Sequence, residues 1–146
     1  MCGDNYPIIS NLKYLGLITA LTSINAKEVI QKVKSILRSD PEFFQYILKI
    51  IPIDFVCETN VKIISQIINS NYREFINKND SFKIDLKRRH NESIDRESFI
   101  EFIAKNIDNK VDLENPDKII RIEILGNYSG LSFIKPDEII RNKAML

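Results

Sequence analysis

The segment IIRIEILGNYSGLSFIK, residues 119–135, contains the strongest structural pattern in the chain. Two apolar, β-prone runs, residues 119–125 and 128–135, flank the dipeptide Gly126-Asn127. Glycine and asparagine tolerate the positive backbone φ of a two-residue hairpin turn, so this dipeptide favours a tight turn between two strands. We therefore expect an antiparallel hairpin as the last part of a sheet.

Upstream of the hairpin, strand-like and helix-like segments alternate. Apolar residues recur at helical spacing from residue 99 to residue 107. Residues 82–86 alternate between apolar and charged side chains, which is typical of a half-buried strand. Another helix is expected after Thr59 or Asn60, because either residue can accept a hydrogen bond from the first free backbone N–H groups of a helix.

The first third of the chain shows the same alternation. Residues 14–21 predict a buried strand, and Asn25 followed by Glu28 has the spacing of a capping box at a helix start. Residues 44–58 predict one long strand, bent or at a sheet edge near Pro52. The order β-α-β-α-β-α-β-β favours an α/β or α+β sheet with helices packed on it.

Composition limits the class of protein. With 146 residues, 44% of them hydrophobic, the chain can form one domain or two half-domains that share a core. The formal net charge of +1 means that any RNA binding must come from a local basic patch. No run approaches the ~20 apolar residues of a membrane span. No signal peptide is visible either, so we expect a soluble, cytoplasmic protein with no membrane partner.

Several kinds of chemistry are not indicated. Neither Cys2 nor Cys57 has a second Cys or His at metal-ligand spacing, and no glycine-rich nucleotide-binding motif is present, so no metal or cofactor is expected. Three acids within residues 111–117 allow a cation site or a structural turn; Asn-Pro-Asp and the spacing favour the turn. The aromatic residues at mostly apolar positions are expected in the core, while Tyr128 is expected to be exposed. The expected core aromatics are Tyr46, Tyr72, Phe99, Phe102 and Phe133.

The sharpest polar feature is the run Lys87-Arg88-Arg89-His90, which follows the expected strand, with Lys83 upstream. Arginine binds phosphate oxygens bidentately and lysine adds point charge. The run leads to a helix start near Arg96, where free backbone N–H groups attract phosphate. The alternative is a solvated charge run that protects a strand edge from aggregation. His90, the only histidine, lacks a patterned catalytic or metal-ligating partner, so no catalytic site is expected.

A resemblance then becomes visible. VDLENPD at residues 111–117, followed by the strand pair and by GLSFIKP at residues 130–136, resembles the C-terminal part of THUMP domains. Residues 46–53, the helix after Thr59, the strand with its basic run and Arg96-Glu97 match in the same order. The similarity covers roughly residues 44–137. Residues 14–38 resemble the N-terminal portion of stand-alone THUMP proteins of the tRNA acetyltransferase-adaptor type. The combination is fairly specific, whereas no single piece is.

The resemblance implies an α+β THUMP fold with helices on a mixed β-sheet, preceded by a ferredoxin-like N-terminal half. It divides the chain into an N-terminal part (1–43), a THUMP-like domain (44–137) and a tail (138–146) that is a short helix or disordered. THUMP domains of tRNA-modifying systems dock the acceptor arm and its 3′ CCA end. The residues expected at the RNA are Lys83, Lys87, Arg88, Arg89, His90, Arg96 and Lys135.

The resemblance also implies a function without catalysis. The chain would be an adaptor that presents tRNA to a separate enzyme, a tRNA cytidine acetyltransferase using acetyl-CoA and ATP or another RNA-modifying enzyme. The near-neutral charge predicts weak tRNA binding by the chain alone. Two alternatives remain open. One is a protein-interaction subunit whose basic run docks on an acidic enzyme face, and the other is a small enzyme with a cryptic site.

Overall fold

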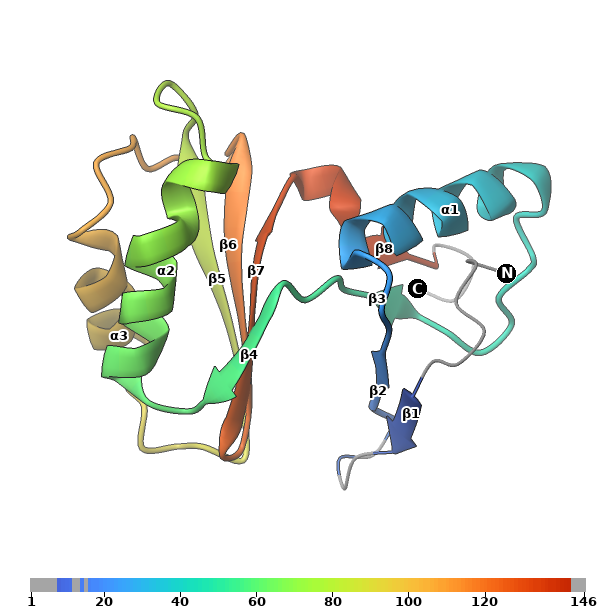
Figure 1. Cartoon of the computed structure of the whole chain (residues 1–146), viewed down its shortest axis with the longest axis horizontal. Helices are drawn as coiled ribbons and strands as arrows, with labels where there is room; N and C mark the ends of the chain where they lie inside the picture. Colours follow the sequence, from blue (N-terminus) through green and yellow to red (C-terminus); the bar gives the residue numbers. More distant parts are fainter. Residues whose placement is uncertain (1–7, 12–13, 15, 143–146) are drawn as a thin grey trace. The chain divides into compact units, whose positions relative to one another are not determined.

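The structure is a computed structural model that describes residues 8–11, 14 and 16–142 (Figure 1). The chain forms two compact units. The larger one comprises Ile51–Ile139, and the smaller one comprises the residues up to Ile50 together with those from Ile140 onward.

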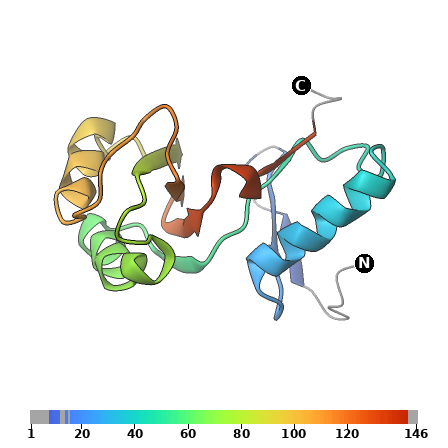
Figure 2. The ribbon, with the colours of Figure 1, turned by 90° about the horizontal axis from the view of Figure 1, so that it is seen from above.

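The larger unit contains a four-stranded mixed sheet in the order β4-β7-β6-β5. Strand β5 is parallel to β6, whereas β7 is antiparallel to both β6 and β4. Helices α2 and α3 lie on the same face of this sheet (Figures 1 and 2). The expected mixed α+β fold is therefore confirmed. The elements are β4 (Phe55–Glu58), α2 (Val61–Phe75), β5 (Phe82–Arg89), α3 (Arg96–Ala104), β6 (Lys118–Leu125) and β7 (Tyr128–Ile134).

Local hydrogen bonds explain where these helices and the hairpin form. The side chain of Asn60 accepts from the backbone N–H groups of Lys62 (2.9 Å) and Ile63 (3.2 Å) at the start of α2. Asp95 caps α3 in the same way, because its carboxylate accepts from the N–H of Ser98 at 3.0 Å. Gly126 has φ +60°, as the tight turn between β6 and β7 requires. The predicted helix starts and the hairpin are thus confirmed.

The core of the larger unit lies between the sheet and the two helices. Its centre is fully buried, and burial of one such side chain contributes about 1.5–3 kcal/mol. The rings of Phe75 and Phe133 stack with centroids 4.8 Å apart. This core holds the sheet rigidly and so fixes the strand ends where polar side chains gather. Its residues with 0% exposure are Ile64, Ile68, Ile103, Ile120, Ile122, Ile124 and Leu131.

The smaller unit has less buried apolar surface. Its described elements are β1 (Ile8–Asn11), β2 (Ile18–Leu21), α1 (Ala26–Ser39), β3 (Lys49–Ile50) and β8 (Ile140–Arg141). Strands β1 and β2 form one antiparallel ladder, and β3 and β8 form another. Asn25 caps α1 by accepting from the N–H of Lys27 at 2.9 Å. The buried side chains of Ile30, Val33 and Ile140 form a small cluster that joins α1 to the second ladder.

The single long strand expected over residues 44–58 is wrong. It splits into β3 and β4, which belong to different sheets. Between them Pro52, which has no N–H for a strand ladder, accepts a 2.6 Å hydrogen bond on its carbonyl from Ser132. Because β3 pairs with β8, the compact units divide after residues 50 and 139. The boundaries of the THUMP-like domain at residues 44 and 137 stay a prediction.

Two expectations about burial and one about the tail also need correction. Residues 18–21 form β2 but all four are exposed, because pairing in a two-stranded ladder satisfies the backbone without covering either face. Tyr46 is 88% exposed in a loop, while Tyr72, Phe99 and Phe133 are buried as predicted. In the tail, Pro136–Glu138 forms a single 3₁₀ turn (η1) and Ile140–Arg141 forms a strand. No helix among the described residues is long and apolar enough to cross a membrane.

Candidate nucleic-acid interface

The predicted basic run lies at the C-terminal end of β5, on the edge of the sheet. Lys87, Arg88 and Arg89 are its last residues, in register with Glu123, Ile124 and Leu125 of β6. His90 follows with φ +56°, a left-handed conformation that turns the chain sharply out of the strand. Lys87 and His90 are exposed, whereas the two arginines are only partly so. The strand end therefore presents part of the run to solvent.

Arg88 and Arg96 hold the loop between β5 and α3. The guanidinium of Arg88 donates to the carbonyl of Ile94, and that of Arg96 donates to the carbonyl of Leu86. The first bond ties the loop to β5, and the second ties the start of α3 to β5. A guanidinium with five N–H groups retains further donors for a ligand. Arg88 also helps to lower the pKa of Asp95, after the larger effect of the hydrogen bonds from Ser98. Both arginines thus have a structural role beside any role in binding.

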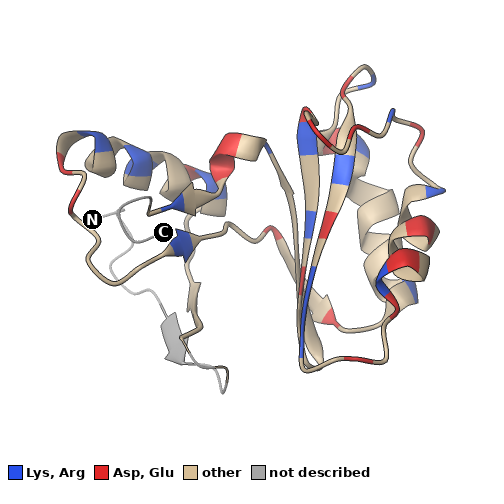
Figure 3. Cartoon of the chain, turned by 180° about the vertical axis from the view of Figure 1, so that it is seen from behind, with Lys and Arg blue, Asp and Glu red and all other residues tan. Residues whose placement is uncertain are grey.

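Arg89 belongs to a chain of alternating charges. It contacts Glu123 at 3.1 Å, and Glu123 also contacts Arg121 at 2.6 Å. Arg121 approaches Asp85 at 3.8 Å, and Asp85 approaches Lys83 at 3.6 Å. Basic and acidic segments alternate along β5 and β6 in Figure 3. Since Asp85 and Glu123 compensate the positive charges, this charge chain attracts phosphate less than its three basic residues alone would.

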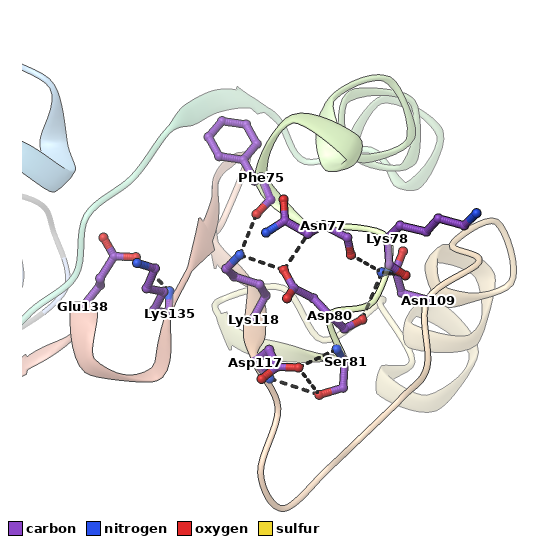
Figure 4. A network of polar contacts seen from close by, with 10 residues as sticks. All are labelled: Phe75, Asn77, Lys78, Asp80, Ser81, Asn109, Asp117, Lys118, Lys135 and Glu138. Atoms are coloured by element: carbon purple, nitrogen blue, oxygen red, sulfur yellow. Dashed lines mark hydrogen bonds and ion pairs between the residues drawn. The ribbon is translucent and has the colours of Figure 1, made fainter.

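The predicted RNA-facing residues do not all come together. Lys83 pairs in register with Ile119, at the opposite end of the sheet from Arg89 and Lys87. Six residues of strand separate Lys83 from Arg89, or roughly 20 Å at the usual rise. Lys135 is exposed beyond the end of β7 at the Lys83 end, where its backbone N–H donates to Glu138 at 2.8 Å (Figure 4). The structure thus brings together Lys87, Arg88, Arg89, His90 and Arg96, and leaves Lys83 and Lys135 apart.

A second polar network closes the Lys83 end of the sheet, and the sequence did not reveal it (Figure 4). The ammonium of Lys118 donates to Asp80 and to the carbonyl of Phe75, both at 2.9 Å. Lys118 and the N–H of Asn77 lower the pKa of Asp80. Asn109 donates to the carbonyls of Asn77 (2.8 Å) and Asp80 (2.9 Å). Because these partners lie about thirty or more residues apart in sequence, no local pattern could have found them.

The acidic segment at residues 111–117 makes the contacts of a structural turn. Asp112 accepts from the N–H groups of Asn115 (2.9 Å) and Glu114 (3.1 Å), and these bonds lower its pKa. Asp117 accepts from both the N–H and the hydroxyl of Ser81. These contacts support the turn interpretation. Within the described residues, no cluster of three or more His, Cys, Asp or Glu side chains has the arrangement of a metal site.

The larger unit is therefore a small α+β domain. It has a basic strand end, a polar loop held by a hydrogen bond from Arg88, and an exposed Tyr128. Residues 59–133 match the family model described as THUMP domain, which is half of the chain. The chain belongs to the THUMP domain family.

Relatives and solved structures support this assignment. The chain is 31% identical over 96 residues to a THUMP domain-containing protein 1 homolog of Drosophila melanogaster, covering 62% of this chain and 30% of the relative. It is 37% identical over 89 residues to a probable tRNA sulfurtransferase of Malacoplasma penetrans (strain HF-2), covering 54% of this chain and 22% of the relative. The chain thus spans less than a third of these curated relatives. The fold resembles the crystal structure of PH1313 from Pyrococcus horikoshii Ot3, with a TM-score of 0.63 at 20% identity, over 90% of this chain and 44% of that one.

Proposed function

We propose that this chain is a non-catalytic tRNA-binding adaptor that presents the acceptor arm and 3′ CCA end to a separate RNA-modifying enzyme in the cytoplasm. The family membership carries this proposal, and the relative named as a probable tRNA sulfurtransferase supports the link to tRNA modification. The enzyme we favour is a tRNA cytidine acetyltransferase, from the resemblance of the chain to adaptor-type THUMP proteins. The chain itself would need no cofactor.

The strand end of β5 supplies a plausible contact surface for this function. Lys87 and His90 are exposed there, and the loop held by Arg88 and Arg96 is pre-formed, so little ordering is required when RNA binds. Single-stranded ends expose phosphates and base edges that duplex RNA hides, and they suit recognition by such a fixed loop.

A gel-shift titration of the whole chain against total tRNA tests the proposal. The tRNA is used with and without its 3′ CCA end, at low and at moderate salt. We expect binding that needs the CCA end and weakens with salt as counterions return to the phosphates. Equal binding of truncated tRNA would contradict the assignment of the 3′ end, and absence of binding at low salt would contradict the tRNA-binding function.

One observation favours a second function, a protein-interaction subunit of an RNA-modification complex. Arg89 and Lys83 are engaged by Glu123 and Asp85, so the sheet presents a mixed pattern of charges that suits a complementary protein surface as well as a phosphate backbone. Co-purification with a tRNA acetyltransferase that survives nuclease treatment and is lost with Lys87→Glu would favour this function. Loss of the complex on nuclease treatment would count against it.

A further inference from the structure

The two faces of the sheet in the larger unit differ. Helices α2 and α3 both lie on one face, where Ile122, Leu131 and Phe133 belong to the core (Figures 1 and 2). Because side chains alternate between the two faces of a strand, the residues between these core positions point to the other face. At one end of this second face, Leu125 of β6 and Tyr128 of β7 lie directly opposite each other.

Tyr128 is an exposed aromatic residue of this second face. It is 65% exposed, whereas Tyr72, Phe99 and Phe133 of the same unit are at most 3% exposed. Leu125 beside it is half-buried. A large ring left in water forgoes the free energy that its burial would contribute. The ring of Tyr128 is therefore available to a ligand.

Hydrogen bonds on either side hold Tyr128 in place. The N–H of Thr59 donates to the carbonyl of Asn127 at 2.8 Å, and the hydroxyls of Thr59 and Ser129 share a hydrogen bond of 2.8 Å. Both neighbours of Tyr128 are thus tied to the short connection between β4 and α2. Because this backbone is already ordered, a ligand that contacts the ring costs the protein little conformational entropy.

Cations lie on the same face as Tyr128. Arg89 of β5 is in register with Leu125, and Leu125 is in register with Tyr128, so these side chains form a row across three strands. Two strand spacings place Arg89 roughly 10 Å from Tyr128. Lys87, two residues before Arg89, is exposed and is not compensated as Arg89 is by Glu123. An aromatic ring with cations beside it can stack on a base while the cations attract its phosphates.

A carboxylate lies on the other side of Tyr128. Glu58 of β4 is exposed and in register with Tyr128. Since a carboxylate repels phosphate, the backbone of a bound strand would pass on the Lys87 side, with the edge of the base toward Glu58. There the carboxylate can accept a hydrogen bond from an amino group. Cytosine and adenine carry such an amino group where uracil carries a carbonyl oxygen.

We infer that Tyr128 is a base-stacking residue. Its ring holds one unpaired cytosine or adenine, Glu58 accepts a hydrogen bond from the amino group of that base, and Lys87 contacts a neighbouring phosphate. The inference rests on the proposed tRNA-binding function and extends it from the loop between β5 and α3 to the sheet. Charged side chains on both sides of the ring favour a nucleotide over a protein, because charged residues are depleted at the centre of protein interfaces. The nucleotide is unpaired, because bases of a duplex are already stacked on one another.

The test measures the affinity of the whole chain for a tRNA transcript over a series of salt concentrations. Tyr128→Ala should weaken binding by roughly 5- to 100-fold, the usual effect of losing one base–aromatic stack. Tyr128→Phe keeps the ring and should bind nearly as tightly as the unmodified chain. The slope of log K against log salt should stay unchanged in Tyr128→Ala, whereas Lys87→Ala should lower it by about 0.7. Circular dichroism checks that each variant folds.

Two controls separate stacking from other causes. Tyr46→Ala removes another tyrosine, which is 88% exposed in the smaller unit, and should leave the affinity unchanged. Glu58→Gln should remove the preference of the chain for a tRNA that ends in CCA over one that ends in UUU. The reason is that an amide both donates and accepts, and so can pair with either kind of base.

The possible outcomes distinguish the inference from the proposed function. Unchanged affinity in Tyr128→Ala, with tRNA still bound, would overturn the inference, leave the proposed function intact and make a protein the partner to seek for this ring. Equal losses in Tyr128→Ala and Tyr128→Phe, or in Tyr128→Ala and Tyr46→Ala, would also overturn it. A preference for CCA that persists in Glu58→Gln would overturn the role of Glu58. Absence of tRNA binding by the unmodified chain at low salt would overturn both the inference and the proposed function.

Discussion

The two units of this chain use their charged residues differently. In the larger unit, Arg89, Arg121 and Lys118 contact carboxylates and backbone carbonyls and hold the sheet together. In the smaller unit, α1 carries five charged residues of which one is acidic, and that residue, Glu28, lies 3.9 Å from Lys32 on the helix surface. The comparison teaches that the number of basic residues is a poor guide to a nucleic-acid surface. In the larger unit, these basic residues are part of the structure of the sheet.

The largest expected effect concerns the core that supports the larger unit. Ile122 has 0% exposure at the centre of the sheet, so Ile122→Ala should lower the free energy of unfolding by about 2–5 kcal/mol. Val56 is 72% exposed on β4, and Val56→Ala should change the same quantity by less than about 0.5 kcal/mol. Urea denaturation of both variants measures this. Equal losses would show that the sheet is not packed as described.

The next effect tests whether the charged residues of the larger unit are structural. Glu123 is buried and contacts both Arg89 and Arg121, so Glu123→Ala leaves two guanidinium groups without their carboxylate. We expect a loss of roughly 1.5–3 kcal/mol in the free energy of unfolding. A double-mutant cycle with Arg121→Ala should show coupling between the two residues. Additive effects would mean that Glu123 and Arg121 do not stabilise each other.

A smaller effect compares the helix caps of the two units. Asn60 accepts backbone hydrogen bonds from Lys62 and Ile63 at the start of α2, whereas Asn25 accepts one from Lys27 at the start of α1. Asn60→Ala should destabilise the protein by about 1 kcal/mol, and Asn25→Ala by less. Thermal denaturation of the two variants checks the order. The reverse order would indicate that the smaller unit depends more on its helix start than its contacts suggest.

The smallest effect is a change in pH dependence. The ammonium of Lys118 lowers the pKa of Asp80 in the folded protein. The stability that this carboxylate contributes is therefore fully present above the unfolded pKa of about 3.9. It is lost as the pH falls through the lower folded pKa. Asp80→Asn should therefore flatten the fall in stability below about pH 4. Denaturation between pH 5.5 and 2.5 measures the profile. Lys118→Met should flatten it too, and a steeper profile in either variant would contradict the assignment.

Local signals predicted the parts of the fold that local interactions determine. Asn60 and Asp95 begin α2 and α3, because a side-chain cap needs only the next three residues. The hairpin at Gly126 is local for the same reason. The basic run was placed correctly at the end of β5. The positive charge of Arg89 is compensated by Glu123, however, which lies 34 positions away in sequence. That pairing follows from the parallel register of β5 with β6, which the sequence pattern does not contain.

The errors have the same origin. Residues 44–58 are mostly apolar and β-prone, and nothing in that pattern distinguishes one long strand from two strands in separate sheets. Tyr46 was expected in the core because its neighbours are apolar, yet it lies in a loop and its side chain is 88% exposed.

Lysine footprinting would locate the RNA on the chain residue by residue. The whole protein is treated with an amine-acylating reagent with and without tRNA, and modification of each lysine is read by mass spectrometry. We predict that tRNA protects Lys87, which is exposed at the basic end of β5, more than Lys83, which lies at the opposite end of that strand. Equal protection of Lys87 and Lys83, or protection of Lys83 alone, would contradict the assignment of the RNA-binding surface to the basic end of β5.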